Sequence, residues 1–172
     1  MGSGFDDWLT PGEVEAGIRL VLAVTIGMVI GLNRDIRGKP TGMRTLGLVS
    51  LGAALSALAA MRVPGIADNA DAMSRVVQGI LQGVLTGVGF IGAGVVLRDR
   101  EAMEIHGLTT AAAVWATAAL GITCALASWP LIAMGAAATL FLLVVVHALE
   151  RITGIRERLG PDAESETGRN ER

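Results

Sequence analysis

Seven polar side chains at the ends of long apolar segments are the residues whose types and spacing could do chemistry. They are Asn33, Arg34, Asp35, Arg44, Asp99, Thr109 and Thr110. Magnesium takes oxygen ligands and usually keeps several waters, so the carboxylates of Asp35 and Asp99 would suffice for a site. The guanidinium groups of Arg34 and Arg44 would oppose a cation bound beside them. We therefore expect a salt-bridged network and no cofactor, with a magnesium ion as the alternative ligand.

This polar cluster has a structural and a functional interpretation. In the first, an ion pair between Arg44 and Asp99 ties together the inner ends of the second and third apolar segments. Thr109 and Thr110 then satisfy backbone groups where the fourth segment begins. In the second, the cluster is a cytoplasm-facing recognition site for a cation, an anion or a partner protein. We expect the ion pair to be scaffold, and Asp35 to be the residue that faces a ligand or partner.

Two further patterns match enzyme sites only in part. Ser50 and His147 fall at similar depths in their segments, but Ser50 lacks a G-x-S-x-G context and His147 is interpreted as an interfacial histidine. Gly87, Gly89 and Gly92 spell G-x-G-x-x-G, the dinucleotide fingerprint, which has meaning only between a strand and a helix. Here the glycines lie inside an apolar run. The sequence therefore predicts a protein that is not an enzyme.

Five apolar segments must position these residues. They cover residues 16–32, 45–61, 76–97, 108–127 and 131–149. About 20 helical residues span the ~30 Å hydrocarbon core of a bilayer, and 52% of the chain is hydrophobic while only 17% is charged. We expect an all-α membrane bundle of five transmembrane helices. Residues 1–160 would form this one domain, ending in a short interfacial helix, and 161–172 would be a disordered tail.

The third segment, Val76–Leu97, has no charge in 22 residues and is unusually rich in glycine. Its six glycines are Gly79, Gly83, Gly87, Gly89, Gly92 and Gly94. Glycine lets neighbouring membrane helices approach closely, and the first three of these recur every four residues. We predict a crowded helix whose glycine faces dock another membrane protein or a second copy of the chain. A local break of the helix at residues 89–94, lining an ion path, is the alternative.

The positive charges predict the orientation in the membrane. With the N-terminus outside, only Arg62 and Arg75 lie in outer loops, and Arg19 lies near the outer edge. The cytoplasmic set is Arg34, Arg37, Lys39, Arg44, Arg98, Arg100, Arg151, Arg156, Arg158, Arg169 and Arg172. The C-terminus would then be cytoplasmic. The net charge of −2 and the lack of a surface rich in Lys, Arg and aromatic residues argue against a nucleic-acid partner.

Capping signals mark where several helices begin. Thr10 and Glu13 have the spacing of a capping box, with Pro11 at the first helical position. Asp71 precedes the third segment and is the predicted cap of that helix. Ser128 stands in the same position before the fifth segment and is its predicted cap.

Four short blocks carry a family resemblance. They are GLNRD at 31–35, KPTGMRT at 39–45, GFIGAG at 89–94 and GLTTAA at 107–112. In this order and spacing they resemble the MgtC/SapB family of bacterial inner-membrane proteins, over about residues 27–149. The resemblance implies a multi-pass protein of the inner membrane. It also implies a role in adaptation to low magnesium, acid or host-like stress.

Two departures from the family pattern bear on function. Members commonly have an acidic residue where this chain has Asn33, which removes one oxygen ligand that a cation site would use. Longer members carry a C-terminal ACT-like domain, so we expect this chain to be a short form without that domain's functions. The leading hypothesis is a membrane homeostasis factor that binds or regulates another membrane protein. The alternative is a transporter or channel for magnesium or another cation, lined by the third segment.

Overall fold

The computed structural model describes residues 10–66, 68–98 and 105–146 of the chain, and these residues are almost entirely helical. Five α-helices follow one another: α1 (Pro11–Asp35), α2 (Met43–Met61), α3 (Ala70–Val95), α4 (Leu108–Leu126) and α5 (Trp129–Phe141). The last continues as a π-helix, Leu142–Val146. Two antiparallel two-residue strands, β1 (Leu97–Arg98) and β2 (Ile105–His106), lie between α3 and α4. The all-α prediction is confirmed, since four of the described helices are long and apolar enough to cross a membrane.

The helices differ from the predicted segments mainly at their ends. Both α1 and α3 begin five or six residues before the predicted segments, at Pro11 and Ala70. The segments were placed by the absence of charge, whereas a helix also includes the polar turn that follows its cap. The capping box between Thr10 and Glu13 is confirmed. The described residues end at Val146. The predicted end of the fifth helix, the predicted interfacial helix and the predicted tail therefore lie outside them.

The cap predicted for α3 is wrong. Asn69 is the N-cap, and its side-chain oxygen accepts hydrogen bonds from the backbone N–H groups of Asp71, at 3.1 Å, and Ala72, at 3.0 Å. Asp71 lies in the first turn instead, where a negative charge still favours the helix N-terminus. Ser128 immediately precedes α5, and its carbonyl accepts the N–H of Ile132 at 3.1 Å.

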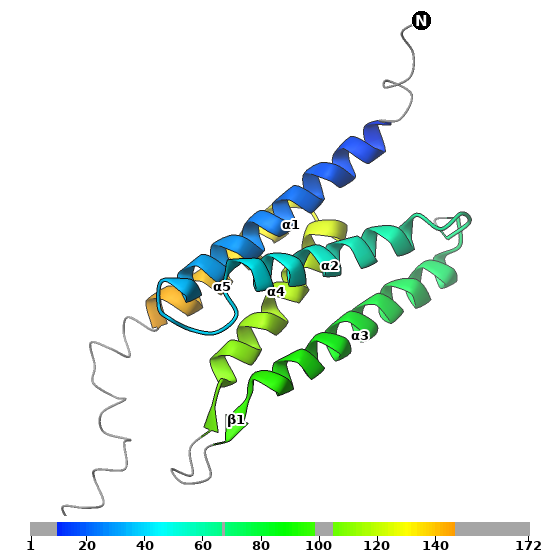
Figure 1. The fold of residues 1–172 in the computed structure, drawn as a ribbon. Coiled ribbons are helices and arrows are strands. Elements are labelled where there is room, and N and C mark those ends of the chain that lie inside the picture. Colours follow the sequence, from blue (N-terminus) through cyan, green and yellow to red (C-terminus); the bar gives the residue numbers. More distant parts are fainter. Residues whose placement is uncertain (1–9, 67, 99–104, 147–172) are drawn as a thin grey trace, which may run out of the picture. The chain divides into compact units, whose positions relative to one another are not determined.

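The chain divides into two compact units, Met1–Ala136 and Ala137–Arg172. In the first unit α1 and α2 pack side by side, α4 packs against both, and α3 contacts α4 and α2 (Figure 1). The helices are unequally buried: 56% of the apolar window of α4 is buried, against 6% of that of α3. The described part of the second unit comprises the end of α5 and the π-helix.

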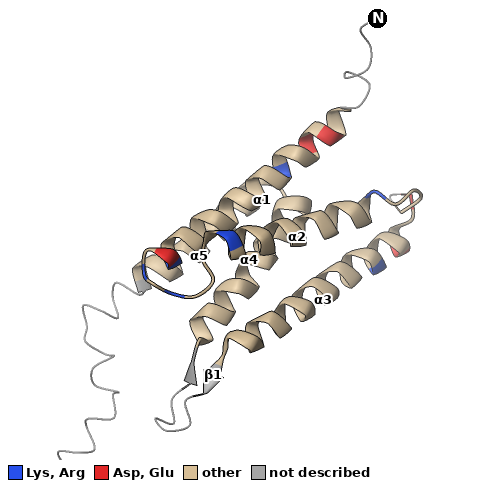
Figure 2. Ribbon diagram, in the orientation of Figure 1, with Lys and Arg blue, Asp and Glu red and all other residues tan. Residues whose placement is uncertain are grey.

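Charged residues gather at the ends of the long helices, and the stretches between them are uncharged (Figure 2). Among the charged residues in the N-terminal half of α1, Arg19 lies furthest from the helix end. Its contacts satisfy its charge and its N–H groups. It pairs with Glu15 at 2.9 Å and donates from Nη1 to the carbonyls of Cys124 and Ala127, both at 2.9 Å. Its guanidinium also lies 5.0 Å from the ring centre of Trp129. Arg19 therefore satisfies carbonyls at the C-terminal end of α4 that no helical N–H can reach.

Candidate functional site

Arg34 is the centre of the polar cluster and is only 3% exposed. From the last turn of α1 its Nη2 donates to the carbonyl of Pro40 at 2.9 Å and to the hydroxyl of Thr110 at the start of α4. Its Nε donates to Oγ1 of Thr41 at 3.2 Å. These acceptors are all uncharged, and charge-assisted hydrogen bonds of this kind compensate the burial of an arginine. Arg34 thus joins three segments: the end of α1, the loop 36–42 and the beginning of α4.

The loop that Arg34 binds has an unusual backbone. Thr41 has a φ of 62°, a left-handed conformation that costs a β-branched residue about 1–3 kcal/mol. Both Oγ1 and the carbonyl of Thr41 accept from Nε of Arg34. The buried guanidinium therefore supplies the contacts that stabilise this conformation, and the loop shape depends on it.

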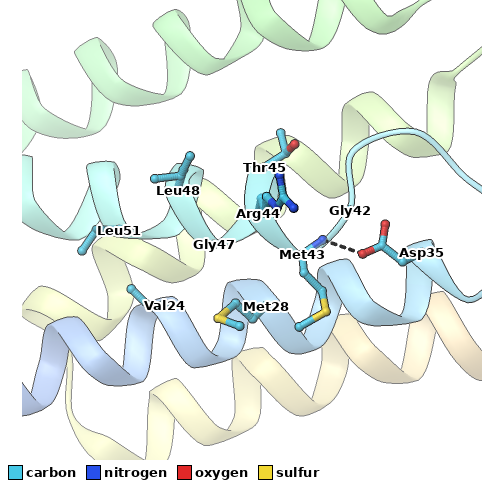
Figure 3. Close-up of a pocket in the computed structure, with 10 residues that line it drawn as sticks. All are labelled: Val24, Met28, Asp35, Gly42, Met43, Arg44, Thr45, Gly47, Leu48 and Leu51. Carbon is cyan, nitrogen blue, oxygen red and sulfur yellow. Dashed lines mark hydrogen bonds between the residues drawn. The ribbon is translucent and has the colours of Figure 1, made fainter.

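Asp35 follows Arg34 in the chain and caps the N-terminus of α2. Its Oδ2 accepts the N–H of Met43, the first residue of α2, at 2.9 Å (Figure 3). The N-cap of α2 is Gly42, which has no side chain to do this. A Cβ on Gly42 would collide with the Asp35 carboxylate, so a larger residue at position 42 would force the Asp35 side chain to move. Asp35 thus places its negative charge at the positive end of the α2 dipole.

A cavity of about 730 Å³ opens between α1 and α2 beside Asp35 (Figure 3). We call it the α1–α2 groove. Asp35, Arg44 and Thr45 line it with polar groups, and Gly42 and Gly47 also contribute. Its apolar lining consists of Val24, Met28, Met43, Leu48 and Leu51. Among the described residues neither Asp35 nor Arg44 takes part in an ion pair.

The structure brings together only part of the predicted cluster. Arg34 binds Thr110, and Asp35 and Arg44 share the groove, while Thr109 is exposed and Asn33 is half-buried. Asp99 lies outside the described residues, so its predicted pairing with Arg44 stays a prediction. The hydroxyl of Thr110 accepts a hydrogen bond from the side chain of Arg34 in α1. Within residues 10–66, 68–98 and 105–146 no group of three or more His, Cys, Asp or Glu could hold a metal ion.

The glycine-rich α3 differs from the prediction of a crowded helix. Among the described residues, nothing comes within 4 Å of a Cβ built at Gly79, Gly83, Gly87, Gly89 or Gly94. Gly92 alone of the six meets a neighbour, with its Cβ position 3.4 Å from the Cβ of Ala111. The reason is that α3 contacts α4 and α2 while only 6% of its apolar window is buried. No described residue covers this face, and its docking to another protein stays a prediction.

The alternative of a broken helix at residues 89–94 is wrong, because α3 runs without interruption from Ala70 to Val95. A continuous helix uses its backbone carbonyls internally, so they are not free to line an ion path. The three glycines of the G-x-G-x-x-G pattern lie inside this same helix, and none of the described residues before them forms a strand. This agrees with the interpretation that the pattern is not a dinucleotide site.

Close glycine packing does occur, but elsewhere. A Cβ on Gly27 of α1 would sit 2.9 Å from Cβ of Ser50, and one on Gly121 of α4 would sit 3.0 Å from Cα of Ser50. A Cβ on Gly31 would lie 2.6 Å from the backbone N of Met43. These close contacts were not predicted from the sequence, although Gly27 and Gly31 have the same four-residue spacing as the glycines of α3. We call the site where α1, α2 and α4 meet around Ser50 the three-helix crossing.

Ser50 itself is fully buried at this crossing. Its Oγ has no hydrogen-bond partner among the described residues. A serine with no exposed surface between closely packed backbones has no room for a substrate. His147, considered with it as a base, lies outside the described residues.

Comparison with known proteins identifies the family. The model of the MgtC family matches residues 20–152. The chain belongs to the MgtC family. Protein SrpB of Synechococcus elongatus is 38% identical over 93% of this chain and 93% of its own length. Protein SapB of Bacillus subtilis is 32% identical over 84% of this chain and 60% of its own length. No solved structure matches.

A third relative, from Escherichia coli, bears the name "Putative magnesium transporter YhiD" and is 40% identical over 77% of this chain. As with SapB, the match spans 60% of that relative's length. The predicted MgtC/SapB resemblance is therefore confirmed, and the match includes α2, α3 and α4 entirely. Together with its four long apolar helices, this makes the MgtC-family chain a multi-pass protein of the bacterial inner membrane.

Proposed function

We propose that this MgtC-family protein acts by binding a transmembrane helix of another membrane protein on the open face of α3. The observation that carries the proposal is that α3 is long and apolar enough to cross a membrane while only 6% of its apolar window is buried. The physiological setting, adaptation to low magnesium, acid or related stress, is the one that the family resemblance implies. The protein would then regulate its partner without catalysing a reaction.

The composition of this face supports a protein partner in place of lipid. Gln78 and Gln82 are exposed, and one helical turn separates them, so both amides lie on the same side of α3. Together with Ser74 and Leu81 they line a shallow cavity of about 460 Å³. Hydrocarbon offers an amide no hydrogen-bond partner, whereas a polar side chain on a neighbouring helix contributes roughly 0.6–2 kcal/mol.

The glycines beside these amides define the kind of partner. Gly79 and Gly83 each follow a glutamine and have no side chain, and nothing described lies within 4 Å of their Cβ positions. A helix packed on this stripe approaches the backbone of α3 closely and gains van der Waals contact that lipid chains do not give. The expected partner is therefore a membrane helix with small residues on its contact side and a polar side chain level with the glutamines.

Photo-crosslinking in native membranes tests the proposal. A photoreactive residue at Leu81, which is 41% exposed on α3, should give one adduct, and the same residue at Val21, 67% exposed on α1, should not. The double variant Gln78→Leu/Gln82→Leu should lose both the adduct and the rescue of a deletion strain in low magnesium, at unchanged protein levels. Absence of an adduct, or an adduct that contains a second, differently tagged copy of this chain, would overturn the proposal.

Cation transport is the second candidate, favoured by the name of the relative YhiD. It predicts magnesium flux into proteoliposomes that contain only this protein, above the rate of protein-free liposomes. If the chain instead regulates a partner, a magnesium-sensitive dye inside the vesicles should report equal rates in both preparations. A rate that rises with protein content would favour transport and contradict the partner proposal.

A further inference from the structure

The α1–α2 groove has the layout of a site for an amphiphile. Asp35 ends α1 and Arg44 lies in the first turn of α2, so both charges are at the ends of their membrane-crossing helices. From there the lining becomes apolar, through Met28 and Leu48, as α1 and α2 continue (Figure 3). Lipid head groups lie at the same level as helix ends, and acyl chains lie beside the apolar turns. A groove that is charged at one end and apolar along its length matches a phospholipid in shape and polarity.

Arg44 supplies the first half of the recognition chemistry. It is exposed, it lines the groove, and it has no ion pair within the described part of the chain. A guanidinium presents a planar fork of N–H donors that fits phosphate with two parallel hydrogen bonds. Arg34, by contrast, is buried and donates to Pro40, Thr41 and Thr110. Arg44 is therefore the cation that lines the groove, and no described carboxylate competes with a phosphate for it.

Asp35 supplies the second half. Its Oδ2 accepts the N–H of Met43, and its carboxylate keeps acceptor capacity beyond that one bond. A carboxylate attracts the cationic part of a head group, and it accepts hydrogen bonds from a primary ammonium but not from a quaternary one, which has no N–H. Asp35 and Arg44 line the same groove without an ion pair between them. Within the described part of the chain, both charges are thus available to opposite charges of one ligand.

We propose that the α1–α2 groove binds a zwitterionic phospholipid with a primary ammonium group, such as phosphatidylethanolamine. The phosphate binds Arg44, the ammonium binds Asp35, and an acyl chain lies along Met28 and Leu48. This site is separate from the open face of α3, because none of the residues lining it belongs to α3. A bound lipid would connect α1 and α2 at the end where Arg34 already joins α1 to α4.

Native mass spectrometry and thermal unfolding of the detergent-purified protein test the site. Phosphatidylethanolamine, phosphatidylcholine and phosphatidylglycerol with identical acyl chains are added in turn. The wild type should retain phosphatidylethanolamine most tightly and gain the largest rise in Tm from it. Equal retention of all three lipids would overturn the proposal, since it would indicate solvation of an apolar surface without head-group recognition.

Charge variants separate the two halves of the site. Arg44→Gln should weaken phosphatidylethanolamine binding about tenfold, the loss expected for a charge-assisted hydrogen-bonded contact. Asp35→Asn keeps an acceptor for the N–H of Met43 but should erase the preference over phosphatidylcholine. Lys39→Gln is the matched control: it removes an exposed positive charge from the loop 36–42, and Lys39 does not line the groove.

Two results with these variants would contradict the binding of a zwitterionic phospholipid in the α1–α2 groove. If Lys39→Gln weakens binding as much as Arg44→Gln, the attraction is general surface charge. If the wild type prefers phosphatidylglycerol and Asp35→Asn strengthens that binding, the site takes an anionic lipid. Should Arg44→Gln fail to fold, Arg44→Lys keeps the charge without the planar fork and should show intermediate affinity. An affinity of Arg44→Lys equal to that of the wild type would contradict the paired phosphate contact.

Discussion

Two glycine-rich regions of this protein have the same spacing and opposite surroundings. In α3, Gly79 and Gly83 are four residues apart and no described atom lies within 4 Å of their Cβ positions. In α1, Gly27 and Gly31 are also four apart, and their Cβ positions fall within 3 Å of the backbone or Cβ of α2. A repeated glycine marks a face on which another backbone can come close. It does not say whether that backbone belongs to the same chain.

The three-helix crossing should be the most sensitive site. Gly121→Ala places a Cβ against the backbone of Ser50, which cannot rotate away as a side chain can. We expect a loss of about 1–3 kcal/mol in the free energy of unfolding, and failure to fold for Gly121→Leu. Unfolding in detergent, followed by circular dichroism, measures this loss.

The matched control for that prediction is Gly52→Ala in α2, where nothing described lies within 4 Å of the new Cβ. This substitution should be neutral or stabilising by up to about 1 kcal/mol, because alanine favours the helix. Equal losses at Gly52 and Gly121 would show that the crossing is not specially crowded.

Removing the buried guanidinium at the end of α1 should have an effect of similar size. Arg34→Gln leaves acceptors at Pro40, Thr41 and Thr110 without their donor. We expect a loss of about 1.5–3 kcal/mol, the usual contribution of hydrogen bonds to a charged group. The loop 36–42 should also become more open to proteolysis, because Thr41 loses the contacts that stabilise its left-handed backbone. Unchanged unfolding and cleavage rates would contradict this role for Arg34.

The open face of α3 should respond in the opposite way. Gly83→Leu adds a side chain into free space, so the isolated protein should change by no more than about 0.5 kcal/mol in stability. In membranes the same variant should lose the crosslink from Leu81, because the leucine blocks the approach of a partner helix. A large destabilisation of the purified protein would show that a second copy already covers the face.

Comparing the two regions explains what the sequence could predict. Long uncharged runs locate the membrane helices, because hydrocarbon excludes charge over a fixed thickness. Local chemistry locates the capping box at Thr10, whose partners are three residues apart. The contact between Arg34 and Thr110 joins residues 76 positions apart. The sequence could therefore predict that both residues belong to a polar cluster, but not that they bind each other. The same holds for Gly27 and Gly121, whose crowding depends on which helices pack together.

No loss of stability is expected from one substitution at the centre of the three-helix crossing. Ser50 is fully buried, and its Oγ has no partner among the described residues, so the hydroxyl has lost water without gaining a hydrogen bond. Ser50→Ala removes that group and leaves Cβ, the atom that contacts Gly27, in place. The unfolding free energy should therefore stay constant or rise by roughly 1 kcal/mol.

Thr117 offers the comparison for this substitution, because it is equally buried but its Oγ1 donates to the carbonyl of Ala113 at 2.7 Å. Thr117→Val removes a hydroxyl that has a partner, whereas Ser50→Ala removes one that has none, so Thr117→Val should stabilise less or cost stability. A clear loss in the free energy of unfolding for Ser50→Ala, together with lost rescue of the deletion strain, would mean that the protein's activity requires the hydroxyl. Retained rescue would assign Ser50 to packing, because the crossing would then need only a small side chain between three close backbones.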